Sequence, residues 1–137
     1  MEAGAYNVYA IVEFSNGESI KTDVKSFEIT TGTSYTVTNT TVTGSIDEGT
    51  KISVEKTIVN NTSKEDATGV IIIAFYDAND NLTGVKTGDS KTLAPKVETK
   101  LNVEFESVPT NTAYAKILIW NSVNGALPLV RPDTLTK

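Results

Sequence analysis

Residues 70–76 read Val-Ile-Ile-Ile-Ala-Phe-Tyr and contain the longest apolar run of the chain. Apolar side chains fall on both parities of the run, which predicts a central β-strand that is covered on its two faces. A turn with Asn and Asp follows at residues 77–81. The run is far shorter than the roughly 20 apolar residues that span a bilayer, so we expect no membrane insertion.

Strand patterns continue on both sides of this run at the spacing that is typical of a β-sandwich. Residues 97–108 alternate, with Leu101, Val103 and Phe105 predicted to face inward. No helical period persists for three turns. The tail from Leu127 is expected to be extended. We predict strands over residues 35–43, 52–59, 82–85, 91–93, 97–108 and 113–120, and therefore an all-β, two-sheet antiparallel sandwich.

The composition supports this fold class and excludes several kinds of chemistry. The chain has 137 residues, of which 21 are Thr, 14 Val and 11 Ile, so a third of it is β-branched and packs well on pleated surfaces. It has no Cys and no His, which excludes disulfides, thiol or imidazole catalysts, and zinc or haem sites that need them. The net charge of −5 comes without a basic stripe, so we expect no nucleic-acid partner.

A β-hairpin is predicted before the sandwich, over residues 5–30. Its turn is Asn16-Gly17, a pair that favours the tight turns of hairpins. The first strand places five mostly apolar residues on one face, namely Tyr6, Val8, Ala10, Val12 and Phe14. Residues 31–34 read as a short linker. We therefore divide the chain into a hairpin, 1–31, and a sandwich domain with an extended tail, 32–137.

Four segments of the sandwich carry a resemblance to a known kind of module. They are Phe75-Tyr76-Asp77-Ala78-Asn79, Leu93-Ala94-Pro95, Tyr114 to Ser122, and Pro128-Leu129. In this order they resemble the immunoglobulin-like or fibronectin-III-like modules of secreted enzymes and surface proteins of Firmicutes. The chain departs from that pattern at Asn121, where the family often has Asp, and it lacks the Gly after Asn79.

The resemblance implies an extracellular or cell-surface location and a non-catalytic accessory role in a multidomain bacterial carbohydrate-active or surface protein. The partners would be neighbouring domains of the same polypeptide, and polysaccharide is a further candidate. Residues 3–30 resemble the final hairpin of a preceding module of this type; alternatively, they complete the sandwich. An unpaired hairpin exposes strand edges, so a hairpin-exchanged homodimer is also expected.

Surface aromatic residues are the candidate carbohydrate site. If Ile117 and Ile119 face inward, Tyr114, Lys116 and Trp120 share the outer face. Tyr76 lies on the same face of its strand as Val70, Ile72 and Ala74, and it is a candidate neighbour of these residues. Aromatic faces stack on the apolar faces of pyranose rings. The alternative is that these rings pack at the rim of the sandwich or against an adjoining module.

Three polar residues in the turn after the central strand are the candidate calcium ligands, Asp77, Asn79 and Asp80. Asp77, Asn79 and Asn81 stand at alternate positions, as at the start of a calcium loop, but the positions that an EF-hand gives to Gly and Glu hold Leu82 and Gly88. A site of Asp77, Asn79 and Asp80 with loop carbonyls is therefore the form that we consider. The alternative is an ordinary turn. No other cofactor is expected.

Two further pairs of residues carry groups that could react. Lys56 interrupts the alternating apolar positions Ile52, Val54 and Ile58, and Asn121 follows the alternating positions 115–119. An isopeptide cross-link between Lys56 and Asn121 is therefore one hypothesis, and a bulge that turns Lys56 outward is the alternative. Glu104 and Glu106 lie about 7 Å apart on one strand face. That spacing suits an inverting glycosidase, but a solvated strand face is the simpler interpretation. We expect no enzyme activity.

Overall fold

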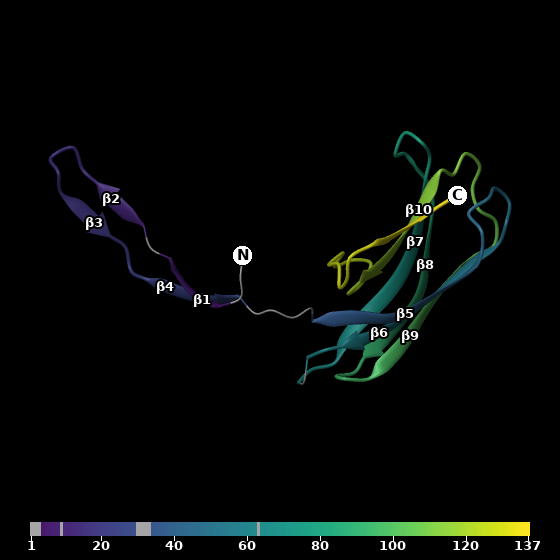
Figure 1. Cartoon of the computed structure of the whole chain (residues 1–137), viewed down its shortest axis with the longest axis horizontal. Helices are drawn as coiled ribbons and strands as arrows, with labels where there is room; N and C mark the ends of the chain where they lie inside the picture. Colours follow the sequence, from purple (N-terminus) through teal and green to yellow (C-terminus); the bar gives the residue numbers. More distant parts are fainter. Residues whose placement is uncertain (1–3, 9, 30–33, 63) are drawn as a thin grey trace. The chain divides into compact units, whose positions relative to one another are not determined.

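The computed structural model describes residues 4–8, 10–29, 34–62 and 64–137 (Figure 1). The chain divides into two compact units, Met1–Gly32 and Thr33–Lys137, and each is described by itself. The described residues form strands, turns and loops. None of them forms a helix that is long and apolar enough to cross a membrane.

The first unit is a β-hairpin in two consecutive sections, as the sequence predicts. β1 (Gly4–Val8) pairs antiparallel with β4 (Lys25–Ile29), and β2 (Ile11–Glu13) pairs with β3 (Ser19–Lys21). The turn has Gly17 at a φ of 85°, in the left-handed region that glycine tolerates best. The predicted linker lies outside the described residues, except for Ser34.

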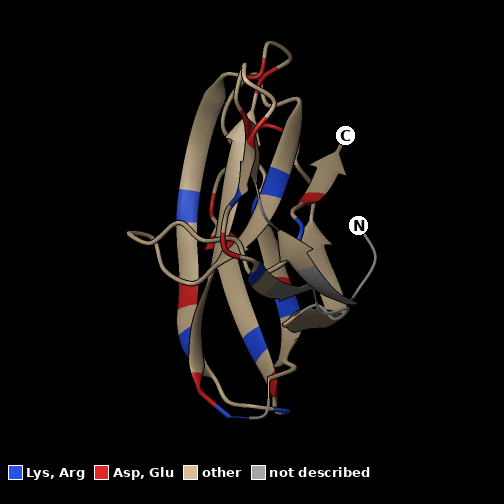
Figure 2. Ribbon diagram, turned by 90° about the vertical axis from the view of Figure 1, so that its left-hand side faces the viewer, with Lys and Arg blue, Asp and Glu red and all other residues tan. Residues whose placement is uncertain are grey.

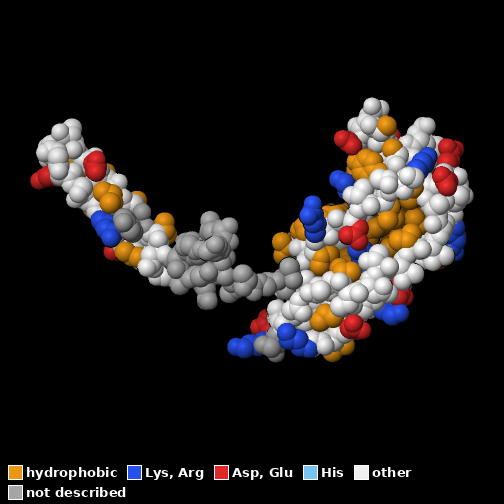
Figure 3. All heavy atoms as spheres, in the orientation of Figure 1, with side chains coloured by type: hydrophobic (Ala, Val, Ile, Leu, Met, Phe, Trp, Pro, Cys, Tyr) orange, Lys and Arg blue, Asp and Glu red, His pale blue; other side chains and the backbone are white. Residues whose placement is uncertain are grey.

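The hairpin leaves large apolar side chains at the surface of its unit. Each of them is about half exposed: Val8, Ile11, Val12, Phe14, Ile20 and Val24. Figure 3 shows such hydrophobic side chains along the hairpin. Val12 lies opposite Ile20 in the β2–β3 ladder, so the two share a face. A two-stranded ribbon with this surface has little core of its own.

The second unit contains two antiparallel sheets. One has three strands in the order β5-β6-β9, and the other has four in the order β11-β10-β7-β8. Their bounds are β5 (Tyr35–Gly44), β6 (Ile52–Asn60), β7 (Ala67–Tyr76), β8 (Leu82–Leu93), β9 (Glu98–Phe105), β10 (Tyr114–Trp120) and β11 (Asp133–Thr136). β7 lies between β10 and β8, which confirms its predicted central position.

The two sheets share one hydrophobic core, an arrangement consistent with a β-sandwich. β6 and β9 contribute side chains from one sheet, and β7 and β10 from the other. Its centre is formed by residues of these strands and by Leu93 of β8, all at most 2% exposed: Ile52, Val54, Ile58, Leu101, Val103, Ile71, Ile73, Phe75, Ala115, Ile117, Ile119 and Leu93. Leu101, Val103, Ile117 and Ile119 therefore face inward as the alternation predicts.

The structure corrects two predicted boundaries. Residues 82–93 form one strand, β8, instead of two short strands around Gly88. Gly88 lies against β9 so closely that a Cβ there would meet the Asn102 carbonyl oxygen at 2.1 Å, which explains a glycine inside this strand. The tail is not simply extended, because Asp133–Thr136 pair with β10 as an edge strand. Four residues are too short for a strand pattern to be recognised without that partner.

Candidate functional site

The outer face of the four-stranded sheet carries the predicted aromatic residues. Tyr114, Lys116 and Trp120 alternate on β10 with the inward-facing core residues. Tyr114 lies directly opposite Tyr76 in the β10–β7 ladder, and Trp120 lies opposite Val70. The structure thus brings all four predicted carbohydrate-site residues to one face. Because paired residues point to the same side, the tyrosines are neighbours and Trp120 lies about 20 Å along the strand.

Tyr76 and Tyr114 form a stacked pair at one end of this face. Their ring centroids are 5.1 Å apart and the ring planes differ by 10°. The Lys116 ammonium lies 5.4 Å from the Tyr76 centroid and 5.7 Å from the Tyr114 centroid. The Tyr114 hydroxyl donates a hydrogen bond of 2.8 Å to Asp80, and this bond raises the pKa of Tyr114 above its ordinary value. The two rings therefore contact each other and the Lys116 ammonium, and these contacts occupy part of their faces.

An apolar trough of about 320 Å³ runs over β7 between the tyrosine pair and Trp120. Its floor holds Ile72 and Ala74, each only 3% exposed, although they point away from the core. Its sides include three aliphatic residues that are more than half exposed, namely Leu82, Val85 and Val123. Sequence patterns do not single out these three residues, because Leu82 and Val85 lie on a strand that was predicted as two short ones and Val123 lies in a turn.

The trough is unusual for the outer face of an antiparallel sheet, which is normally polar. Among the described residues that line it, Tyr76, Thr87 and Trp120 are those whose side chains carry hydrogen-bonding groups. Such a surface suits apolar or aromatic groups of a ligand. A sugar ring could lie against Trp120, but few groups are present to bind its hydroxyls.

The turn at residues 77–81 uses its carboxylates for its own structure. Asp77 accepts hydrogen bonds from the backbone N–H groups of Asn79 and Asn81, at 2.8 and 2.9 Å, and from the Asn81 side-chain amide at 2.9 Å. The side-chain bond from Asn81, followed by its backbone bond, lowers the pKa of Asp77. No three acidic residues of the described chain gather as a metal site. Calcium binding by Asp77, Asn79 and Asp80 stays a prediction.

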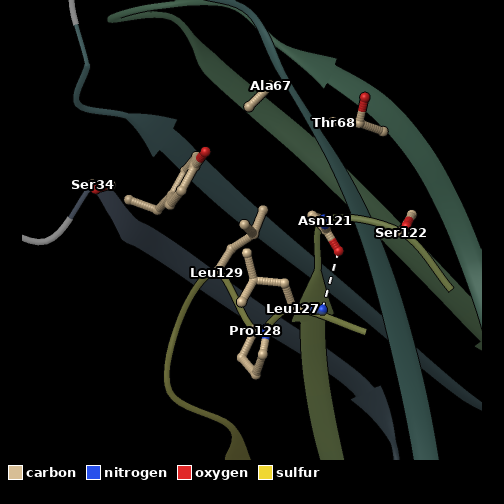
Figure 4. A pocket seen from close by; sticks show the side chains of 9 residues that line it. Ser34, Ala67, Thr68, Asn121, Ser122, Leu127, Pro128 and Leu129 are labelled. Atoms are coloured by element: carbon tan, nitrogen blue, oxygen red, sulfur yellow. Dashed lines mark hydrogen bonds between the residues drawn. The ribbon is translucent and has the colours of Figure 1, made fainter. Parts of the chain in front are cut away.

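Lys56 is buried, with 2% of its side chain exposed, and its ammonium contacts a carboxylate oxygen of Asp133 on β11. It does not bulge outward. Asn121, the predicted cross-link partner, lines a pocket of about 680 Å³ at the end of the sandwich. Figure 4 shows its side-chain oxygen accepting a hydrogen bond from the Leu127 backbone N–H, at 3.1 Å. The structure therefore gives the Lys56 ammonium another neighbour, Asp133, which sequence patterns do not indicate because β11 is too short to be recognised from them.

Glu104 and Glu106 share a cation on their strand face. Lys51 lies 2.6 Å from Glu104 and 3.5 Å from Glu106. The hydrogen bond from Lys51 lowers the pKa of Glu104. An acid catalyst of glycoside hydrolysis needs a raised pKa, so the shift has the opposite direction. Figure 2 shows acidic and basic residues interspersed along the strands.

Comparisons with known proteins add no family to this description. No family model and no curated protein sequence matches the chain.

Proposed function

We propose that residues 33–137 form an immunoglobulin-like or fibronectin-III-like accessory module of a secreted or surface-attached bacterial protein. The strand order carries this proposal. The first, second and fifth strands of the unit make one sheet, and the seventh, sixth, third and fourth make the other. Crossing between sheets after the second, fourth and fifth strands is the kind of connection that such sandwiches use.

The role that we propose for the module is to space or stabilise neighbouring domains without catalysis. Its first and last strands, β5 and β11, lie at edges of different sheets, so a force along the chain acts across the shared core. We propose further that the hairpin of residues 1–31 forms the last two strands of another such module. Val12 and Ile20 support this, because they are half exposed and share a face that a second sheet would cover.

A retardation assay tests the accessory role directly. Affinity electrophoresis through gels that contain soluble polysaccharides, one per gel, compares the full chain with a non-binding reference protein. An accessory module migrates as it does without polysaccharide. Retardation by any of the polysaccharides contradicts a purely positional role.

Carbohydrate binding is the second candidate function, and one observation favours it. Tyr76, Tyr114 and Trp120 lie on one sheet face, and Tyr76 and Trp120 line a common trough. The stacking of the two tyrosines leaves Trp120 as the main platform. Under this function, Trp120→Ala abolishes retardation by the bound polysaccharide. Phe14→Ala removes an exposed aromatic ring from the hairpin instead, and it leaves the retardation unchanged.

A further inference from the structure

The edge strand β5 leaves one side of its backbone without a partner strand. Among the described strands it pairs with β6 alone, because the order of its sheet is β5-β6-β9. Its ten residues, Tyr35–Gly44, include no charged residue and no proline, and all of them except Tyr35 and Val37 are exposed. Such an edge is a template for another strand, since free N–H and C=O groups line it and no charge repels a partner.

The other edge strands of the sandwich are protected. β8 and β9 lie at edges of different sheets, and side chains link them to each other. Lys91 on β8 donates a hydrogen bond of 2.7 Å to the Lys100 carbonyl oxygen on β9, and the Asn102 side-chain amide donates one of 3.3 Å to Asp89. β11 has only four residues, includes a carboxylate and directly follows a proline. Among the described edges of this unit, β5 is therefore the one without such protection.

The part of β5 that is best suited to further pairing follows its bulge. The β5–β6 register shifts once, near the start of β5, and then runs without a break over residues 39–44. Thr41 lies near the middle of this stretch, opposite Glu55 on β6. The next residue, Val42, lies opposite the core residue Val54, so Thr41 points to the outer face of the sheet.

We propose that two copies of the chain associate by antiparallel pairing of their β5 strands, with Thr41 beside its counterpart in the second copy. The contact has two-fold symmetry, so both copies use the same surface and the assembly is closed. It would join the three-stranded sheets of the two copies into one continuous sheet.

The charge of the chain indicates why a second copy fits this edge. With a net charge of −5, two copies repel each other overall, and they can approach most closely where no like charges meet. β5 brings uncharged residues against uncharged residues along its whole length. Threonine pairs across antiparallel strands are stabilising, and like charges at the same positions are not.

This interface differs from the exchange of hairpins that an unpaired hairpin suggests, because residues 1–31 take no part in it. It also does not rest on the proposed accessory role, since it concerns an edge of the sandwich and not what the module spaces or binds. A single pair of strands buries less surface than a standard protein interface, so the association is expected to depend on concentration.

Sedimentation equilibrium of the full chain over a series of concentrations tests the proposal. The average mass of the wild type is expected to rise toward that of two chains. Thr41→Lys should weaken the association by about tenfold or more, because it places two ammonium groups side by side across the strand pair. Thr92→Lys is the matched control, since it puts the same charge on an exposed residue of β8, and it should associate as the wild type does.

Loss of the fold does not explain such a result. Within each copy the new ammonium of Thr41→Lys lies opposite the Glu55 carboxylate, which favours the native pairing, and the variant reduces the net negative charge that repels the copies. An unchanged thermal unfolding midpoint of the dilute variant checks the fold. Thr41→Glu should also weaken the association, whereas an equal mixture of Thr41→Lys and Thr41→Glu should restore it, because opposite charges then meet.

Three results would overturn the proposal. The first is a wild-type chain that stays monomeric to the highest concentration reached, and the second is a Thr41→Lys chain that associates as strongly as the wild type. The third is an association that Val12→Lys abolishes and Thr41→Lys does not, because that result assigns the contact to the hairpin.

Discussion

The ring of Tyr76 stacks on the ring of Tyr114, with centroids 5.1 Å apart and planes within 10° of each other. This contact joins β7 to β10 at one end of the outer face. At the same end, Asp80 accepts a hydrogen bond from the Tyr114 hydroxyl. It also means that two of the three aromatic residues on this face contact each other, and the free aromatic surface is concentrated at Trp120.

Tyr114 should ionise at a higher pH than an ordinary tyrosine. Because the hydrogen bond to Asp80 raises the pKa of Tyr114, the stability that it contributes is complete below the ordinary value of 10.0 and is lost as the pH rises through the folded-state pKa. Tyrosinate absorbance during an alkaline titration measures this. Asp80→Asn should move one ionisation to lower pH, whereas Asp23→Asn, in the hairpin, should leave the curve unchanged.

The turn after β7 should lose stability in acid through Asp77. Its folded-state pKa lies below the ordinary value of 3.8, so its contribution is present above that value and is lost as the pH falls through the folded pKa. Thermal unfolding across this acidic range should show a smaller dependence on pH in Asn81→Ala, which removes the largest cause of the shift. An Asn81→Ala profile identical to that of the wild type would show that the hydrogen bond does not persist in solution.

Phe75→Ala should strongly destabilise the sandwich. Phe75 is fully buried and contacts Phe105 edge to face, with centroids 4.8 Å apart. Removing such a ring leaves a cavity that costs about 3–5 kcal/mol of unfolding free energy. Urea denaturation measures the loss. Val97→Ala, at a residue that is 52% exposed, is the control and should change stability by less than about 0.5 kcal/mol.

Gly88→Ala and Gly69→Ala should differ although both place a methyl group in a tight site. At Gly88 the added Cβ meets backbone atoms of β9, including the Asn102 carbonyl oxygen at 2.1 Å. At Gly69 it meets the end of the Leu93 side chain at 2.8 Å, which can move. We expect Gly88→Ala to cost about 2 kcal/mol or more, and Gly69→Ala less. Equal losses in urea denaturation would contradict the close approach of β8 to β9.

Trp120 should report on occupation of the trough, because it is the single tryptophan of the chain. An apolar dye that enters the trough should change Trp120 emission, and Leu118→Lys should weaken that response by placing a charge beside the floor. Val97→Lys puts the same charge at an exposed residue that does not line the trough. If both variants respond to the dye equally, the trough is not where it binds.

Much of this architecture could be predicted from local patterns. Strict alternation places Leu101, Val103, Ile117 and Ile119 in the core, because a strand sends successive side chains to opposite faces. The doubly apolar run at residues 70–76 identifies the central strand for the same reason. Asn16-Gly17 identifies the hairpin, since few residue pairs tolerate the required backbone conformation.

Contacts between distant strands decided the rest. Asp133 and the three residues that follow it become a strand only because β10 offers an unpaired edge, and only then does a carboxylate reach Lys56 from the other sheet. The exposed aliphatic residues of β8 join Trp120 in one trough only when the sheet is assembled. Periodicity along the chain indicates which face of a strand a side chain occupies. Which side chains meet depends on how distant strands pair, as for Lys56 and Asp133, 77 positions apart. No local pattern contains that information.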